Sequence, residues 1–465
     1  MIFSKKAMKY VLLGITFQIL ILGCKIMKYS PEKQITHDLN YNHDLDNNDN
    51  FSPDNQWLVY DTRTDEGGIA ISAKIEKVNT ETGEKKVLYQ VKNNQSWGPG
   101  VGAASYSPVE NAVVFIHGLA NVSEKQPYQQ WRRTGVIVDE SNIEKPIFMD
   151  ARDIDFPYTK GALRGGTHRH EWSDNGKMIG FTYNDAIMKS LEDSTGEKHN
   201  LRTIGISKKR NPVNVKPNGK GENISGEWFS VLVVRVVANP KSGSDEISYA
   251  SGDSWVGKNG YLKENGTQQI ARAFIGTVRD KNGKSVDEVF IVDIPENLDI
   301  EGNFGALEGT KATLPMPPKG AFQRRLTFTA ETEQPGCVGI VRSSPDGDLL
   351  AFLAKDKRGI RQVFSILPNG ENLTQITFHQ TDVEGSIRWH PRGESLFYIA
   401  EGSVFQSKIG SDSFEKRFMQ ISKPSSPSPT NLVVSHDGKT LAFNRVLLSE
   451  TQKTSKQIFI IKLLE

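Results

Sequence analysis

The chain lacks the features of several common protein classes. Its 465 residues contain only two cysteines, Cys24 and Cys337, which excludes a disulfide framework. Lys and Arg number 57 against 55 Asp and Glu, so the net charge of +2 provides no drive towards nucleic acid or an acidic surface. No nucleophile elbow, zincin helix, phosphate-binding loop or dinucleotide fingerprint occurs. Function must therefore be sought from the architecture.

Long hydrophobic runs are also scarce, and one of them marks the N-terminus. Residues 10–22 are uncharged and apolar and follow three lysines. At about 13 residues the run is shorter than the roughly 20 that span a bilayer, which is typical of a signal peptide. Ile21-Leu22-Gly23-Cys24 resembles a bacterial lipobox. An ordinary signal or anchor is the alternative.

The lipobox resemblance implies that Cys24 becomes the lipidated first residue of the mature chain. Residues 1–23 are then a signal peptide and residues 24–33 a tether. Lys25 stands where an aspartate would favour inner-membrane retention, so we expect a lipoprotein at the outer membrane, facing the periplasm. Cys337 is left as an unpaired, buried thiol.

What the sequence does contain is a repeat. A few apolar residues lead into a tight turn of Ser-Pro-Asp-Gly type, and a hydrophobic strand follows. Proline presets the first turn dihedral, Asp or Asn bonds locally, and glycine accepts a positive φ. The six copies are Phe51-Ser52-Pro53-Asp54, Tyr106-Ser107-Pro108, Trp172-Ser173-Asp174-Asn175-Gly176, Ser343-Ser344-Pro345-Asp346-Gly347, Trp389-His390-Pro391-Arg392-Gly393 and Val434-Ser435-His436-Asp437-Gly438.

Units of about four strands, mostly about 45 to 65 residues apart, predict an all-β propeller over residues 34–465. Residues 228–237 and 289–294 are interpreted as a degenerate further unit, which favours seven blades, with six as the alternative. The last unit ends one strand short at residues 457–463. Gln34-Ile35-Thr36 matches the ends of other units, and we expect it to supply the missing outer strand.

These repeats resemble the propeller of TolB-type proteins, and more closely a family of uncharacterised bacterial TolB-like propellers. The resemblance extends from about residue 34 to the C-terminus and implies the fold, but no settled activity. At residues 336–342 the chain lacks the histidine that the family often has there. The segments that carry the resemblance are residues 56–63, 161–188, 243–246, 255–257, 323–329 and 388–393.

Candidate ligand-binding residues gather in the third unit. When the units are aligned on the turn serine, small residues dominate five positions earlier, near the channel mouth, except for His168. His168 follows Arg164-Gly165-Gly166, and glycines let backbone approach a ligand. Arg164 can bind a carboxylate through two donors, or it can form a salt bridge that fixes the loop. His168 can bind a ligand or metal, or it can make a structural hydrogen bond. For His170 the alignment favours burial.

Two further pairs of residues are candidates. Asn184 and Asp185 end the next strand and offer hydrogen bonds to a carbohydrate, or else form a turn. Arg342 and Arg388 both precede the turn serine by two positions. They either line the channel or pair with acids between blades.

Two functions remain open. The first is a monomeric, non-catalytic, lipid-anchored envelope protein that binds a protein or glycan partner at the channel mouth and needs no cofactor. The second is an enzyme resembling oligogalacturonate lyases, which are seven-bladed propellers with histidine-bound metal near the axis. That resemblance implies a divalent metal on His168 and His170, with Arg164 on a uronate carboxylate. A peptidase is disfavoured because the ring leaves no room for a hydrolase domain.

Overall fold

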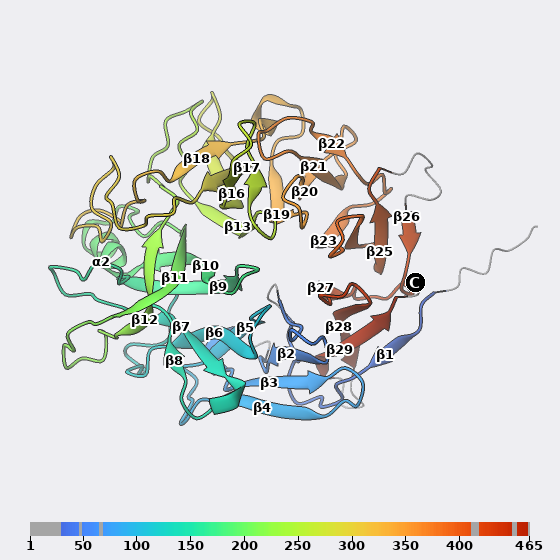
Figure 1. The fold of residues 1–465 in the computed structure, drawn as a ribbon, viewed down its shortest axis with the longest axis horizontal. Helices are drawn as coiled ribbons and strands as arrows, with labels where there is room; N and C mark the ends of the chain where they lie inside the picture. Colours follow the sequence, from blue (N-terminus) through green and yellow to red (C-terminus); the bar gives the residue numbers. More distant parts are fainter. Residues whose placement is uncertain (1–28, 46–48, 65–67, 411–417, 449–452, 464–465) are drawn as a thin grey trace, which may run out of the picture.

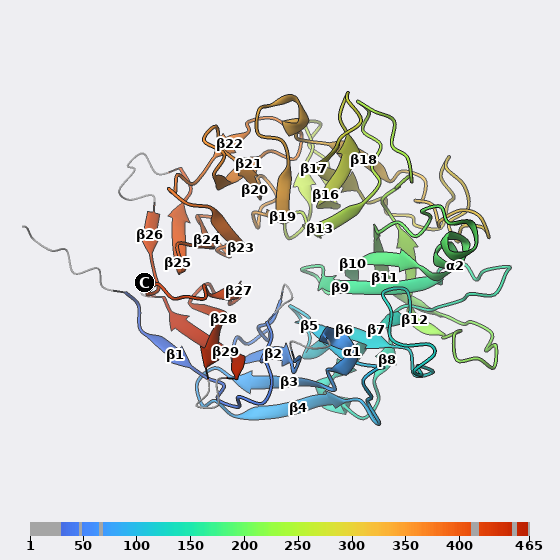
Figure 2. The ribbon, with the colours of Figure 1, turned by 180° about the vertical axis from the view of Figure 1, so that it is seen from behind.

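Seven small antiparallel sheets stand around a central axis in the computed structural model (Figure 1), which describes residues 29–45, 49–64, 68–410, 418–448 and 453–463. The predicted all-β, seven-bladed propeller is therefore confirmed, and the six-bladed alternative is wrong. Figure 2 shows the same ring from behind, with the first and last blades adjacent. The proposed signal peptide and Cys24 lie outside the described residues.

The first three blades, from the inner strand outwards, are β2 (Trp57–Asp61), β3 (Lys74–Asn79) and β4 (Lys85–Gln90); β5 (Val101–Tyr106), β6 (Ala112–Gly118), β7 (Arg133–Asp139) and β8 (Ile147–Phe148); and β9 (Gly165–Trp172), β10 (Met178–Asp185), β11 (Thr203–Val213) and β12 (Gly226–Leu232). The fourth and fifth blades are β13 (Ala250–Trp255), β16 (Ala271–Arg279), β17 (Ser285–Asp293) and β18 (Phe322–Arg325), and β19 (Cys337–Ser343), β20 (Leu350–Lys355), β21 (Arg361–Ile366) and β22 (Thr374–Gln375). The sixth and seventh are β23 (Val383–Trp389), β24 (Ser395–Ala400), β25 (Ser403–Lys408) and β26 (Phe418–Gln420), and β27 (Thr430–Val434), β28 (Thr440–Leu448), β29 (Thr454–Lys462) and β1 (Glu32–Gln34). Outside the blades are the hairpin β14 (Tyr261–Leu262) and β15 (Gln268–Gln269), the helices α1 (Gly68–Ile71) and α2 (Ala186–Thr195), and the 3-10 turns η1 (Glu140–Asn142) and η2 (Thr329–Glu331).

The repeated turn has the predicted chemistry. In the fifth blade the Ser344 hydroxyl donates to Asp346 and accepts the backbone N–H of Leu349 at 3.0 Å. Gly347 takes the left-handed conformation with φ 84°, which a side chain would strain. These turns all return the chain at one end of the channel, which we call the turn face.

The ring is closed by the two ends of the chain, as predicted. β1 pairs with β29, with Glu32 opposite Ile461 and Gln34 opposite Phe459. The pairing continues beyond β1, because the Ile35 N–H donates to the carbonyl of Ile458 at 3.0 Å. The seventh blade thus has three strands from the C-terminus and one from the N-terminus.

The interpretation of residues 228–237 was wrong. Their first part is β12, the outer strand of the third blade, paired with β11. The inner strand of the fourth blade is β13, which follows a long loop and has no Ser-Pro-Asp turn after it. The blade count is still correct, because β17 covers residues 289–293 of the predicted strand 289–294 and belongs to the fourth blade.

Aromatic side chains on the inner strands pack between blades, as the alignment predicted. Tyr106, Trp172 and Trp389 are all buried. Trp172 Nε1 donates to the carbonyl of Ser105 in the preceding blade at 3.3 Å, and Trp389 Nε1 to that of Arg342 at 2.9 Å. Truncating a buried aromatic costs about 3–5 kcal/mol, so these contacts contribute substantially to ring stability.

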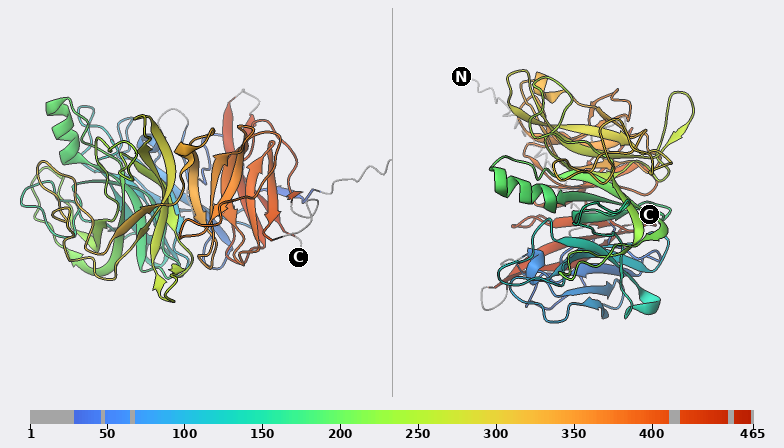
Figure 3. Two further views of the ribbon diagram at one scale, coloured as in Figure 1. Left: turned by 90° about the horizontal axis from the view of Figure 1, so that it is seen from above. Right: turned by 90° about the vertical axis from the view of Figure 1, so that its left-hand side faces the viewer.

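Figure 3 shows the disc edge-on, with α2 standing on one of its faces. α2 begins directly after Asp185, which pairs with Gly165 at the start of β9. The face where the inner strands begin is therefore the α2 face, opposite the turn face. Among the described residues, no helix has the length and apolarity to cross a membrane.

Candidate functional site

The third blade holds both candidate histidines on its inner strand, on either side of a bulge. Arg169 lies between them with a left-handed φ of 60°, where the register between β9 and β10 shifts. His168 is half-buried, and its Nδ1 lies 3.4 Å from Thr182 Oγ1. Burial, then the charges of Arg133 and Arg202, hold the pKa of His168 well below its usual value. His168 lies at the channel mouth and remains a candidate ligand-binding residue.

His170 is fully buried, as its alignment predicted. Its Nε2 lies 3.0 Å from Thr167 Oγ1, and burial together with Arg133 lowers its pKa to about 3. Gly135 leaves room for the ring, since a Cβ there would meet His170 Nε2 at 2.8 Å. His170 is therefore a neutral core side chain in this structure.

Arg164 forms a buried ion pair rather than an open carboxylate grip. Its Nε and Nη2 both donate to Asp185 Oδ2, at 3.0 and 2.9 Å, and neither side chain is exposed. Tyr183 donates to the same carboxylate oxygen at 2.8 Å. Of the two roles left open by the sequence, the structure shows the loop-fixing one.

Asp185 and Asn184 are also engaged within the chain. Asp185 Oδ1 accepts the backbone N–H of Met188 at 2.9 Å, so this residue caps the N-terminus of α2. Asn184 Nδ2 donates to Asn200 Oδ1 at 3.3 Å. The sequence did not predict α2.

Gly165 and Gly166 bring backbone close to other protein groups. A Cβ on Gly166 would lie 2.2 Å from the carbonyl oxygen of Gln130 and 2.8 Å from Arg133 Cγ. The close approach expected from the glycine pair therefore exists, and its immediate partner is the second blade.

The two candidate arginines of the fifth and sixth blades line the channel, and one of them also pairs with an acid. Arg342 Nη1 lies 3.2 Å from Glu171 Oε1, and Glu171 Oε2 lies 3.0 Å from Arg272 Nη2. Glu171 thus joins the third, fourth and fifth blades. Burial lowers the pKa of Arg342 to about 10, with Glu171 opposing the shift.

Arg388 is in a different position. Its Nη1 donates to the neighbouring carbonyl of Ile387 at 2.8 Å, and its Nε is buried with no hydrogen-bond partner among the residues that the structure describes. No carboxylate in the described part of the chain forms an ion pair with it. Burial, then the charges of Arg342 and Arg169, hold the pKa of Arg388 well below its usual value.

Two hollows meet at Arg388. One, of about 290 Å³, opens near the α2 face and is lined also by Arg169 and Asn431. The other, of about 230 Å³, opens at the turn face and is lined also by Asp49 and Glu171. Burial and the charge of Glu171 raise the pKa of Asp49 to about 6. Arg388 is therefore accessible from both sides to a charged ligand group.

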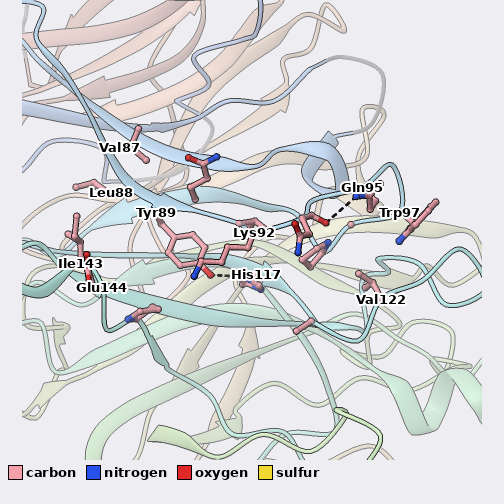
Figure 4. A pocket seen from close by; sticks show the side chains of 17 residues that line it. Val87, Leu88, Tyr89, Lys92, Gln95, Trp97, His117, Val122, Ile143 and Glu144 are labelled. Carbon is pink, nitrogen blue, oxygen red and sulfur yellow. Dashed lines mark hydrogen bonds between the residues drawn. The ribbon is translucent and has the colours of Figure 1, made fainter.

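A larger hollow of about 980 Å³ lies on the outer rim between β4 and the second blade (Figure 4). Tyr89 from β4 reaches His117 from β6, with 3.0 Å between the hydroxyl and Nε2. Trp97 and Val122 lie towards the other end, and Ile143 and Glu144 near Val87. The lining is mixed, and none of the residues singled out from the sequence contributes to it.

Sequence reasoning missed Arg133, Arg202, Asp49 and Glu171. Arg133 precedes the apolar run Val136-Ile137-Val138 in the sequence, and this run could have marked its strand as buried, which the structure shows for six of its seven residues. Arg202, Asp49 and Glu171 become candidates only in the folded structure, where neighbouring blades bring them close to other charged side chains.

The histidines do not complete a metal site with other side chains. Within the described ranges, no three His, Cys, Asp or Glu residues come together in a way that could hold a metal ion. His168 faces Thr182 and His170 faces Thr167, so a bound metal would lack a third protein ligand here.

Among solved structures, the chain is similar in fold to two oligogalacturonate lyases. One is in complex with manganese, with 11% identity, 94% of each chain covered and a TM-score of 0.50. The other, from Vibrio parahaemolyticus, has 9% identity, 94% of each chain covered and a TM-score of 0.54. At these identities the likeness shows the propeller fold alone.

Sequence comparisons identify the family. A family model described as a protein of unknown function (DUF3748) matches residues 100–222, which span the second blade and most of the third. The uncharacterised Escherichia coli protein YidR is 37% identical over 424 residues, covering 89% of this chain and 95% of YidR. The expected uncharacterised family is thus confirmed, while the TolB likeness remains a prediction. The chain belongs to the family of YidR.

Proposed function

We propose that this protein is a non-catalytic, lipid-anchored binding protein of the cell envelope, which holds an acidic group of a protein or glycan partner in its central channel. The observation that carries the proposal is Arg388. It is a channel-lining guanidinium without a carboxylate partner among the described residues, and it faces both hollows. Arginine donors match a carboxylate geometrically, so a ligand carboxylate would supply the missing charge.

The first experiment tests the channel. Immobilised wild-type protein and the Arg388→Gln variant are incubated with envelope extract, and bound proteins and glycans are identified by mass spectrometry. We expect the variant to recover at least about tenfold less of the same partner, the usual loss for an anchoring arginine. Arg392→Gln, a change at an exposed arginine, should behave as wild type. Equal recovery by all three proteins, or no partner at all, would overturn the proposal.

The anchor is tested separately at Cys24. Lipidation at this residue predicts that the Cys24→Ser variant leaves the membrane fraction, whereas wild type sediments with it. The fraction of protein in each pool is measured by immunoblot. A wild-type protein found mainly in the soluble pool would contradict the anchor but would leave ligand binding untouched.

The lyase alternative predicts a chemical product. Incubation with oligogalacturonate and manganese would yield unsaturated products that absorb ultraviolet light. We expect none, because Arg164 is bonded to Asp185 and the histidine pair has no third ligand in the described part of the chain. An absorbance increase with wild type that is lost in His168→Ala would replace the binding proposal.

A further inference from the structure

A second unusual cation lies between the second and third blades. Arg133, the first residue of β7, is 3% exposed. Its Nη1 donates to the Tyr128 hydroxyl at 2.9 Å. Its Nε and Nη2 are buried and have no hydrogen-bond partner among the described residues. β7 and β9 are neighbours in the ring, so Arg133 stands beside the third-blade mouth.

The surroundings of Arg133 are basic. Arg202, between α2 and β11, is half-buried, and its Nε is buried without a partner in the described part of the chain. Arg133 and Arg202 each act electrostatically on His168, and Arg202 also acts on Arg133. The backbone agrees with this proximity, because Arg133 Cγ lies against Gly166, two residues before His168, and Arg202 precedes Thr203, whose strand partner Tyr183 also pairs with Thr167. Two guanidinium groups therefore lie near a half-buried imidazole.

The two acidic residues of this region, Asp185 and Asp150, bind groups other than Arg133 and Arg202. Asp185 is bonded to Arg164 and to the Tyr183 hydroxyl. Asp150 accepts the backbone N–H of Gly135 at 2.7 Å and the Thr167 hydroxyl at 3.2 Å, and the cation that acts on its pKa is Arg152. No described carboxylate lies within ion-pair distance of Arg133 or Arg202.

A buried charge without a counter-ion is costly, and so is each unmet guanidinium donor. Folds tolerate such a cost where a ligand offsets it. We infer that Arg133 and Arg202, with His168 beside them, form a binding site for an oxyanion, either a carboxylate or a phosphate. The site goes beyond the proposed function, because it is separate from Arg388 and has its own ligand class.

The geometry indicates how the ligand is held. Arg133 is fixed, since its stem packs on Gly166 and its Nη1 is held by Tyr128. Its Nε and Nη2 lie on one edge of the guanidinium and form a preformed pair of donors that suits two oxygens of one group. Because neither atom is exposed, a ligand reaches them only when a neighbouring side chain moves aside. Arg202 and His168 are half-buried, so the ligand enters past them from the α2 face.

The test is thermal unfolding of the full mature chain in sodium chloride, sodium acetate and sodium phosphate at equal ionic strength and pH. We expect acetate or phosphate to raise the wild-type melting temperature by at least about 2 °C over chloride. The salt that gives the larger rise identifies the oxyanion. Both Arg133→Gln and Arg202→Gln should lose this rise. Arg279→Gln, a change at a half-buried arginine at the end of β16, should keep it.

Arg133→Gln also separates binding from a structural role. In chloride we expect this variant to melt no lower than wild type, because it removes an uncompensated charge. A purely structural arginine would instead lower the melting temperature in all three salts. The inference is overturned by no rise in wild type, or by an equal rise in wild type and in the two site variants. Arg202→Gln decides the question if Arg133→Gln fails to fold.

Discussion

At the residue scale, the pair of Arg164 and Asp185 illustrates how a motif that suits a ligand can serve the fold instead. Both side chains are fully buried, and the carboxylate also receives Tyr183 and caps α2. The Asp185 carboxylate therefore binds Arg164, accepts the Tyr183 hydroxyl near the end of β10 and caps the N-terminus of α2.

Removing Arg164 should consequently unfold the protein more easily. We expect Arg164→Ala to lower the free energy of unfolding by about 3–5 kcal/mol, because Asp185 is left buried and unpaired. Urea unfolding followed by circular dichroism measures it. Arg210→Ala breaks the more exposed pair with Asp299 and should change stability by about 1 kcal/mol or less. Similar costs for the two variants would contradict the structural role.

Asp150 makes the stability of the protein depend on pH. It is fully buried, and burial raises its pKa to about 7, above the usual 3.8. Between these values the folded protein holds a proton that the unfolded chain has lost. The free energy of unfolding therefore falls as pH rises through this window, by up to about 1.4 kcal/mol per unit.

Asp150→Asn should remove this dependence. We expect the variant to match wild type most closely near about pH 3, where Asp150 is largely protonated in both states, and to exceed it near about pH 8. Urea unfolding at the two pH values gives the difference. A variant with the same deficit at both would show that Asp150 is charged in the fold at all pH values.

The residue scale is also where prediction from sequence succeeds least. Burial of His170 followed from strand alternation, whereas the alignment left open whether Arg342 and Arg388 line the channel or pair with acids between blades. The partner of Arg164 could not be predicted, since Asp185 lies 21 residues away and its pairing depends on β10 returning beside β9. The sequence around Arg133 did not indicate that its guanidinium lacks a described counter-ion, because this depends on all the side chains that surround it in the folded protein.

At the element scale, β1 is the strand that closes the ring. It contributes the pairing with β29, the buried Ile35 and an ion pair between Glu32 and Arg445, with 2.7 Å between Oε2 and Nε. A chain that begins at His37 should therefore melt several degrees lower than the mature chain, since losing Ile35 alone costs about 2–5 kcal/mol.

Hydrogen exchange identifies the backbone amides that lose protection when β1 is removed. Amides of β29 opposite β1, such as Ile460, should exchange faster in the chain that begins at His37. A chain that begins at Tyr29 keeps β1 and is the control. Unchanged exchange in β29 would mean that the pairing of β1 adds little.

Element boundaries were predictable where turn chemistry marks them. Each Ser-Pro-Asp-Gly turn identified an inner strand and its neighbour, and Gln34-Ile35-Thr36 was recognised by its likeness to other outer strands. β13 was missed because no such turn follows it, and α2 because its cap, Asp185, was interpreted as a strand end.

At the scale of the whole molecule, Cys337 reports on opening of the ring. Its side chain is fully buried, and burial raises its thiol pKa to about 12. In a Cys24→Ser background, we expect no reaction with a thiol reagent until the protein unfolds globally. The labelling rate should match the unfolding rate measured by fluorescence. Rapid labelling in the absence of denaturant would reveal local opening between the fourth and fifth blades.

The architecture as a whole was the most predictable feature, because one short pattern is repeated around the ring and each copy adds independent support. The function was not, because a propeller places its binding groups where blades converge, and that convergence is absent from any local stretch of sequence.

The closure by β1 and β29 has a consequence for biogenesis. β1 is synthesised before β29, and nearly the whole propeller lies between them in the chain. The ring can therefore lock only after β29 has been made, and until then the blades already synthesised form an open series. Such a delay would suit the cell-envelope location that we propose, because an exported polypeptide is threaded through a translocation pore before it folds.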